Sequence, residues 1–392
     1  MQPSATLAMT AAAKSRIREG HPVIGLSAGE PDFDTPAVIA EAGIQAIRDG
    51  HTHYTANPGY PELREEIARK LSRDNGIEVD PNQILCSNGA KQSVAQAVLA
   101  LVRDGDEVLI PAPYWVSYPE MVRLAGGTPT AIPTTHETGY LLSPGQLEAS
   151  ITDRTRLLIL CSPSNPTGGV YTPEMLEGLV EVLRRHPQIY VISDEIYEYI
   201  VYDTAHRSLA SFEGMAHRTV TVNGFSKAYA MTGWRLGYLA ADTEIVKAAA
   251  KIQSQLTSAP SSITQMAGIA ALRLDPGVVR DMVVAFRRRR DMMVERLNAI
   301  EGIVCPVPEG AFYLFPDVGY WLGAETSDGT VIRDTQDLCM YILHEHNVAL
   351  VPGQAFGGPS GLRVSYAASE SDLMTAADRL DAAFAGLTLK SA

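Results

Sequence analysis

Groups that can do chemistry recur at one kind of place in this sequence, directly after a short apolar run. An amide, an indole, a carboxylate and an amine each stand within a few residues of such a run. If the runs are strands of one open α/β sheet, these groups reach the edge at which ligands bind. The runs and the groups that follow them are 84–87 with Asn88, Gly89, Ala90 and Lys91, 107–110 with Tyr114 and Trp115, 157–161 with Asn165, 190–193 with Asp194 and Tyr197, and 219–222 with Ser226 and Lys227.

Lys227 is the candidate amine nucleophile. It lies in GFSKAYAMTGWR, a glycine-rich and largely apolar stretch in which Phe225, Tyr229 and Trp234 are its neighbours. A lysine usually lies on a solvated face, but burial among such side chains lowers the pKa of its ammonium group. The free amine can then act as a nucleophile. Arg235 closes the same segment and could bind an anion.

Asp194 ends an apolar run, where a carboxylate needs a partner if it is buried. It could cap a helix formed by 195–200 (EIYEYI), which is the simpler interpretation, or pair with a positive group of a ligand. Tyr197 follows three residues later, which in a turn or helix places its phenol on the same side. Most such tyrosines only pack, so the residues alone leave both interpretations open.

Other positions also have an ordinary and a functional interpretation. Gly89 and Ala90 either make a tight turn or open a helix whose backbone N–H groups hold a phosphate. Trp115 either packs in the core or stacks on a flat cofactor. Arg363, in GLRVSYA, needs an anionic partner, which is either a substrate carboxylate or an internal acid. The arginines at 287–290 predict a solvated helix face.

The apolar runs themselves predict the fold. They are short, do not alternate with polar residues, and are separated by helical patterns such as 90–102 and 173–185. This is typical of strands buried on both faces of a mostly parallel α/β sheet, flanked by helices, with 236–240 as its last strand. A long charged helix over 283–300, two short apolar segments and a last amphipathic helix over 370–386 indicate a smaller α+β domain.

The length of 392 residues suggests about two to three folding units. The first residues hold too little apolar material for a core of their own, so we expect 1–42 to pack on the smaller domain. We expect a large domain over 43–280 and a small C-terminal domain over 281–392.

Composition excludes several classes of protein. Thirty-two Lys and Arg against 45 Asp and Glu give a net charge of −13, which disfavours binding to nucleic acid or to an anionic membrane. Four scattered cysteines without a CxxC pair predict neither disulfides nor a metal site, and fit a reducing cytoplasm. No apolar run approaches the ~18 residues of a membrane span. Motifs for a P-loop, a zinc hydrolase, a nucleophile elbow and a dinucleotide site are absent.

Eight segments, in order along nearly the whole chain, resemble the class I aminotransferases. The resemblance implies a fold-type-I enzyme that uses pyridoxal phosphate, bound in the large domain. No single segment is decisive, but their number and order argue against chance. They are AGEPDFDTP (28–36), YTANPGYPELR (54–64), NGAKQ (88–92), PYWVSYPEM (113–121), NPTG (165–168), SDEIYE (193–198), SKAYAMTGWRLGY (226–238) and RVSYA (363–367).

The resemblance implies a role for each matching position. Lys227 would form the internal Schiff base with the cofactor and, once displaced, act as the general base. Asp194 would keep the pyridine nitrogen protonated. The remaining roles are Tyr197 and Asn165 at the 3-oxygen of the ring, Trp115 stacked on the ring, Gly89, Ala90, Ser226 and Arg235 at the phosphate, Arg363 at the substrate α-carboxylate, and Gly29 covering that carboxylate.

The resemblance also implies partners. Tyr54 would reach the phosphate in the partner subunit's site, so the enzyme would be a homodimer with shared active sites. Its other partners would be an amino acid and a 2-oxo acid. The subgroup it resembles is that of the bacterial aspartate aminotransferases, in which a threonine and a lysine contact the distal carboxylate of the substrate. Thr6 and Lys91 occupy those positions here.

The expected activity is transfer of the amino group of L-aspartate, or glutamate, to a 2-oxo acid by a ping-pong mechanism. Other members of the subgroup transaminate prephenate, and Ala90 and Ser93 depart from the pattern of close relatives, so prephenate, arogenate or aromatic substrates remain alternatives. A pyridoxal-phosphate-dependent lyase, a binding module without turnover and a scaffold without cofactor are further alternatives. Thr6 and Lys91 argue against the lyase.

Overall fold

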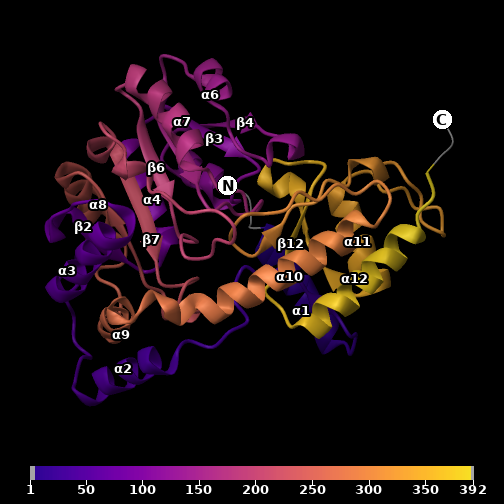
Figure 1. Ribbon diagram of the computed structural model, residues 1–392, viewed down its shortest axis with the longest axis horizontal. Coiled ribbons are helices and arrows are strands. Elements are labelled where there is room, and N and C mark those ends of the chain that lie inside the picture. Colours follow the sequence, from indigo (N-terminus) through magenta and orange to yellow (C-terminus); the bar gives the residue numbers. More distant parts are fainter. Residues whose placement is uncertain (1–4, 390–392) are drawn as a thin grey trace.

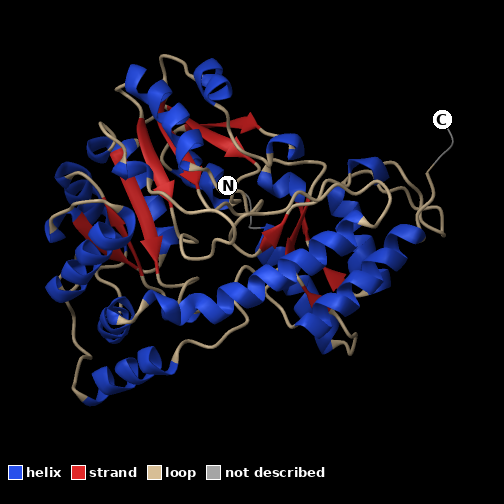
Figure 2. Cartoon of the chain, in the orientation of Figure 1, coloured by secondary structure: helices blue, strands red, loops and turns tan. Residues whose placement is uncertain are grey.

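A seven-stranded sheet organises the larger of two parts of the molecule (Figures 1 and 2). The structure, a computed structural model, describes residues 5–389. The strand order is β2-β8-β7-β6-β5-β3-β4, and β8 alone runs against its neighbours. The strands are β2 (Ile84–Ser87), β3 (Glu107–Ala112), β4 (Thr128–Pro133), β5 (Thr155–Cys161), β6 (Tyr190–Asp194), β7 (Thr219–Gly224) and β8 (Gly237–Ala240).

This sheet confirms the predicted fold class, with two differences. The first is β4, which the sequence pattern did not indicate because its residues TPTAIP are partly exposed and include two prolines. Such a sequence suits the edge of a sheet, where β4 lies. The second is the direction of β8. It follows β7 through the loop 225–236 rather than through a crossover helix, so the chain returns antiparallel.

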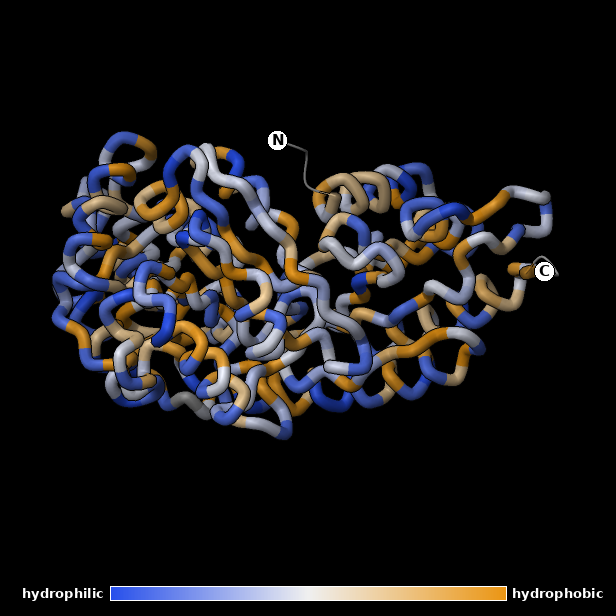
Figure 3. The backbone as a smooth tube through the Cα atoms, turned by 90° about the horizontal axis from the view of Figure 1, so that it is seen from above, coloured by the Kyte–Doolittle hydropathy of each residue, from blue (hydrophilic) through white to orange (hydrophobic). Residues whose placement is uncertain are grey.

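Helices cover both faces of this sheet, which explains why its strands are apolar throughout. The cluster on one face joins side chains of α4, α5 and α8 to the strands, and the cluster on the other joins α6 and α7. Figure 3 shows apolar stretches in both parts of the molecule, interspersed with hydrophilic ones. The helices here are α2 (Ala37–Arg48), α3 (Pro61–Lys70), α4 (Ala90–Leu101), α5 (Ser117–Leu124), α6 (Pro144–Ser150), α7 (Pro173–Arg185), α8 (Thr243–Leu256) and α9 (Ser262–Arg273).

The smaller part is α+β, as expected. Its strand β1, from the N-terminal segment, pairs in parallel with β10; the packing of 1–42 as a whole stays a prediction. The boundaries at 42/43 and 280/281 stay a prediction. Within residues 5–389, no helix has the length and apolarity needed to cross a membrane. The elements are α1 (Ala5–Arg18), β1 (Ile24–Gly25), α10 (Arg280–Asn298), β9 (Tyr313–Leu314), α11 (Thr335–His346), β10 (Val348–Ala349), β11 (Val351–Pro352), β12 (Leu362–Ser365) and α12 (Glu370–Ala385).

The consecutive arginines of α10 do not form the solvated face that the sequence predicted. This helix runs from the larger part into the smaller one (Figure 1), and of its four consecutive arginines only Arg287 and Arg288 are exposed. Arg289 and Arg290 are 8% and 3% exposed. Arg289 Nη1 donates to Asp32 Oδ1 at 2.7 Å, so it ties the N-terminal segment to α10. The prediction was therefore wrong for two of the four residues.

Gly237 sets how closely β8 approaches the start of α4. A Cβ atom at Gly237 would overlap the backbone nitrogen of Ala90. We expect Gly237→Ala to lower the free energy of unfolding by about 2 kcal/mol or more, because backbone cannot move aside as a side chain can. Urea titration measures this. Gly233→Ala is the matched control, since nothing lies within 4 Å of its Cβ position. Equal losses in the two variants would contradict the prediction.

Candidate active site

A cavity of about 390 Å³ lies where the ends of β2, β3, β5, β6 and β7 meet the N-terminal segment and the smaller part. Gly89 adjoins it through Arg235, whereas Tyr54 is fully exposed on the surface and does not line it. The structure therefore brings together nearly all of the residues singled out from the sequence. Those that line the cavity are Thr6, Gly29, Ala90, Lys91, Trp115, Asn165, Asp194, Tyr197, Ser226, Lys227, Arg235 and Arg363.

Lys227 lies in the loop between β7 and β8 and points into this cavity. Its Nζ donates to the backbone carbonyl of Gly29 and lies 5.8 Å and 5.9 Å from the ring centres of Tyr197 and Phe312. Burial lowers the pKa of the ammonium group to about 8, and the positive charge of Arg363 adds to this effect. A lysine with this pKa supplies a free amine near neutral pH.

Asp194 ends β6 and is 4% exposed. Its Oδ2 accepts a hydrogen bond from the Tyr118 hydroxyl at 2.6 Å, and its Oδ1 accepts one from the backbone N–H of Ile196 at 3.3 Å. The residues after it form a turn rather than the helix that capping would require. Burial raises the pKa of Asp194 to about 6, because these two bonds do not offset the loss of water. A positive ligand group would stabilise the carboxylate.

Arg363 is buried on β12 without an acidic partner among residues 5–389. Its Nη1 donates to Asn165 Oδ1 at 3.2 Å and its Nη2 to the Ser27 carbonyl at 2.6 Å, while its Nε has no partner in the described chain. Burial lowers the pKa of Arg363. Of the two partners that the sequence left open, the structure provides no internal acid, so the guanidinium is available to an external carboxylate.

The start of α4 offers donors for a phosphate. Gly89 has φ +88°, and a Cβ atom there would overlap the guanidinium of Arg235. No side chain caps α4, and the Gln92 N–H donates to the Gly89 carbonyl at 3.0 Å, which leaves the N–H groups of Ala90 and Lys91 without an acceptor among residues 5–389. Arg235 Nη2 donates to the Asn88 carbonyl at 3.3 Å, and Ser226 lines the same cavity. A helix N-terminus beside an arginine and a hydroxyl suits a phosphate.

Thr6 and Lys91 add a second set of polar groups that lack partners. The Oγ1 atom of Thr6 is buried and accepts or donates no hydrogen bond within the described residues. Lys91 Nζ lies 5.0 Å from the ring centre of Trp115. Burial lowers the pKa of Lys91, and the charge of Arg235 contributes. A hydroxyl and an ammonium group in one cavity can receive a carboxylate.

Tyr118 and Tyr313 are site residues that the sequence did not reveal. Tyr118 bonds to Asp194, and the Tyr313 hydroxyl pairs with that of Tyr197 at 2.8 Å. The guanidinium of Arg363 also lies over the Tyr313 ring, 4.8 Å from the ring centre. Tyr118 lies in PYWVSYPEM and Tyr313 in EGAFYLFPD. The sequence around such a tyrosine does not distinguish one that only packs from one that orients another group.

Comparisons with known proteins agree with this geometry. Residues 21–380 match the family model described as Aminotransferase class I and II. The chain is 55% identical to a bifunctional aspartate aminotransferase and glutamate/aspartate-prephenate aminotransferase of Petunia hybrida, covering 97% of this chain and 80% of that one. It is 47% identical to an aspartate/prephenate aminotransferase of Cereibacter sphaeroides, with 99% and 98% coverage.

Solved structures are similar as well. The aspartate aminotransferase from Rhizobium meliloti superimposes with a TM-score of 0.95 and 45% identity, covering 99% of this chain and 98% of that one. The aspartate aminotransferase from Thermus thermophilus with maleate superimposes with a TM-score of 0.91 and 40% identity, with 98% and 97% coverage.

The lowered pKa of Lys227 can be measured directly. We expect covalent capture of pyridoxal phosphate by the cofactor-free protein, trapped with borohydride, to increase with pH with a midpoint near 8, because the amine form appears above the pKa of about 8. Mass spectrometry of the labelled peptide measures capture. N-acetyl-lysine, treated in parallel, corrects for ionisation of the reagent. A midpoint near the ordinary lysine value of about 10.4 would contradict the assignment.

Proposed function

The chain belongs to the class I and II aminotransferases, and from this premise we propose that it transfers the amino group of L-aspartate or L-glutamate to a 2-oxo acid. The enzyme is a transaminase that depends on pyridoxal phosphate. One observation carries the preference for an acidic substrate: the cavity holds Arg363 and Lys91, neither of which has an acidic partner among residues 5–389, together with the unpartnered Thr6 hydroxyl. A dicarboxylic amino acid supplies two carboxylates for these groups.

The residues of the cavity fit the cofactor. The conformation of Gly89 leaves room for Arg235 beside the free N–H groups of α4, which suits a phosphate. The raised pKa of Asp194 shows a carboxylate that lacks a cation, and a protonated ring nitrogen would be one. When bound, pyridoxal phosphate supplies the electron sink for the bonds at the substrate Cα. We assign Gly89, Ala90, Ser226 and Arg235 to the phosphate, Asp194 to the ring nitrogen, Tyr197 and Asn165 to the ring oxygen, and Trp115 to the ring face.

Lys227 is the residue that we expect to move the proton. Because the pKa of Lys227 lies near 8, its Nζ can accept a proton from the substrate Cα and then release it again, since neither form of the amine is strongly favoured near neutral pH. Arg363 would hold the α-carboxylate, with Gly29 beside it, and so fix which face of the substrate meets Lys227. The reaction would proceed in two half-reactions, with one 2-oxo acid leaving before the next binds.

Prephenate is the second substrate that we propose, as an alternative amino acceptor. The names of the Petunia and Cereibacter relatives both include prephenate. Prephenate also carries two carboxylates, so the pairing of Arg363 with Lys91 and Thr6 suits it as well. Prephenate is tested by adding it after the half-reaction with aspartate described below: return of the cofactor absorbance would support it as an acceptor, and an unchanged absorbance that 2-oxoglutarate then restores would refute it.

We also propose a homodimer, in which Tyr54 acts in the partner subunit's site. The fully exposed Tyr54 side chain does not line its own cavity. Figure 1 shows α2 at the outer edge of the larger part, and Val38, Ile44 and Ile47 of this helix are exposed. Exposed apolar side chains on this helix and a fully exposed tyrosine suit a subunit interface. The four free cysteines suit a reducing compartment, and we propose the cytoplasm.

A half-reaction tests the substrate preference. L-aspartate, added to the cofactor-loaded enzyme without a 2-oxo acid, should bleach the cofactor absorbance and release one equivalent of oxaloacetate per site. We expect Lys91→Met to lower kcat/KM for aspartate by about 10- to 100-fold, the value of a charge-assisted hydrogen bond, and to change it little for alanine and phenylalanine.

Two controls accompany this assay. Lys227→Ala should show no turnover and sets the background. Equal losses for aspartate, alanine and phenylalanine in Lys91→Met would show that Lys91 does not select the side chain. If the loaded enzyme shows the cofactor absorbance but aspartate does not change it, the proposed cofactor site would stand and the proposed substrate would be refuted. A lyase, by contrast, would release its product but would not transfer the amino group to a 2-oxo acid.

Mixed dimers test the role of Tyr54. Neither Lys227→Ala nor Tyr54→Ala homodimers should show full activity. In a hybrid dimer, one site combines Lys227 of the Tyr54→Ala chain with Tyr54 of the Lys227→Ala chain, and is therefore intact. We expect about half of the wild-type kcat per hybrid, since one of two independent sites works. Activity no higher than that of the Tyr54→Ala homodimer would place Tyr54 in its own subunit's site.

A further inference from the structure

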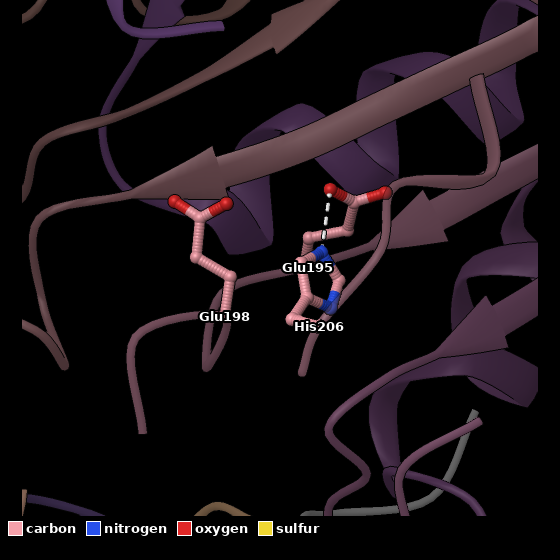
Figure 4. Close-up of side chains that lie close together, drawn as sticks. All are labelled: Glu195, Glu198 and His206. Atoms are coloured by element: carbon pink, nitrogen blue, oxygen red, sulfur yellow. Dashed lines mark hydrogen bonds and ion pairs between the residues drawn. The ribbon is translucent and has the colours of Figure 1, made fainter. Parts of the chain in front are cut away.

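The turn after β6 carries two pairs of side chains that face opposite ways. Asp194 and Tyr197 line the cavity. Glu195 and Glu198 do not line it, and they are buried, at 0% and 6% exposure. Figure 4 shows these two glutamates with His206 between the surrounding strands and loops. The members of each pair are three residues apart, so one turn presents one pair to the cofactor site and the other to the protein interior.

Glu198 is held from α3 and from the π-helical turn that follows it, η1 (Leu71–Asn75). Lys70, 2% exposed, forms an ion pair with Glu198 Oε1 and donates to Asn75 Oδ1 at 2.6 Å. Asn75 Nδ2 donates to Glu198 Oε2 at 2.7 Å and to Ser208 Oγ at 2.7 Å. Both oxygens of this carboxylate therefore have a buried donor.

Glu195 is held from the other side. His206 Nε2 lies 3.1 Å from its Oε2, which also accepts from Ser208, and Ser193 Oγ donates to its Oε1 at 2.8 Å. Burial alone would raise the pKa of Glu195, but His206 and the two hydroxyls keep it below the ordinary value. Burial alone would lower the pKa of His206, but Glu195 and then Glu198 raise it above its ordinary value.

We interpret these groups as an ionic network rather than a metal site; within residues 5–389, the buried Nδ1 atom of His206 has no hydrogen-bond partner. The ligand atoms of Glu195, Glu198 and His206 lie within 4.8 Å of one another, a spacing that a metal ion could use. However, the Lys70 ammonium already pairs with Glu198, and His206, whose pKa is raised by Glu195, contacts that carboxylate through Nε2. A divalent ion on Glu198 would have to displace one of the two buried donors that hold this carboxylate, the Lys70 ammonium at Oε1 or the Asn75 amide at Oε2, at the cost of a buried hydrogen bond.

We propose that Glu195 and Glu198, with the donors that hold them, form a rear anchor that positions Asp194 and Tyr197 for the cofactor. The inference rests on the proposed role of Asp194 toward the ring nitrogen. Asp194 has two hydrogen bonds of its own, from Tyr118 and from the backbone of Ile196. Such a carboxylate needs further support to keep its direction.

The backbone transmits this support. Glu195 directly follows Asp194, and its N–H donates to the Val222 carbonyl at 2.8 Å on the neighbouring strand. A shift of the Glu195 side chain therefore turns the peptide that carries Asp194. Buried ion pairs contribute little net stability compared with apolar packing, but their directional bonds fix orientation. If the turn served the fold alone, apolar side chains could replace Glu195 and Glu198 on its inner side, so the buried charges point to a role in orientation.

The test uses His206→Leu, which removes the donor and the charge but keeps the volume. We expect the dissociation constant for pyridoxal phosphate to rise about tenfold and kcat to fall about tenfold, as for loss of a hydrogen bond to a charged group, with KM for the amino donor unchanged. Equilibrium dialysis of the full chain measures the first quantity without any amino acid. His206→Gln, whose amide can still donate to Glu195, should recover most of the loss.

A matched control comes from the surface. His186 Nε2 lies 2.9 Å from Glu148 Oε1 in a comparable pair outside the cavity, so His186→Leu should leave all these quantities unchanged. A lower melting temperature with wild-type cofactor affinity and kcat in His206→Leu would overturn the proposal, since the network would then serve the fold alone. Loss of affinity after dialysis against a chelator would overturn it in favour of a metal site.

Two further variants keep the test decisive. If His206→Leu does not fold, Ser193→Ala removes one donor to Glu195, and we expect about threefold weaker cofactor binding. Wild-type binding in Ser193→Ala would then overturn the proposal. Asp194→Asn should weaken binding more than either variant. Wild-type binding there would refute the role of Asp194 itself, which separates failure of the anchor from failure of the proposed function.

Discussion

The carboxylate buried at the end of β6 is the constraint on which the rest of the site depends. Asp194 cannot keep its charge at low cost, because burial raises its pKa to about 6 despite two hydrogen bonds. None of the side chains that bond to it is a cation, so a cation in direct contact would lower this cost, and the ring nitrogen of the cofactor is the one that we propose. The fold creates this demand by placing β6 in the middle of a sheet whose two faces are both covered by helices.

Much of the fold could be predicted from the sequence because the central strands are buried on both faces. Such strands appear as plain apolar runs, and the runs at 84–87 and 190–193 fall on β2 and β6. The edge strand β4 could not be found this way, since one exposed side removes the apolar signal. The direction of β8 could not be predicted either, because it depends on how the loop 225–236 folds. The pairing of β1 with β10 depends on a contact between residues more than 300 positions apart in the sequence.

The site residues that directly follow strands could be predicted from the sequence. Those whose role depends on tertiary contacts could not. Lys227 and Asp194 share one edge because parallel strands end together. Tyr118 and Tyr313 become recognisable only through the groups that they contact. The arginines at 287–290 illustrate the same limit. At 3.6 residues per turn, four consecutive side chains point around most of the helix, so a helix packed between two parts must bury some of them.

The charges of the cavity connect binding with chemistry. The chain carries a net charge of −13, yet the cavity is lined by four cations and only two anions: Lys91, Lys227, Arg235 and Arg363 against Glu30 and Asp194. This excess favours phosphates and carboxylates over neutral ligands. It also helps to lower the pKa of Lys227. Bound anions offset that positive field, so the Lys227 amine becomes a stronger base once a carboxylate lies on Arg363. In the proposed reaction, the substrate carboxylate would thus strengthen the base that takes the substrate's own proton.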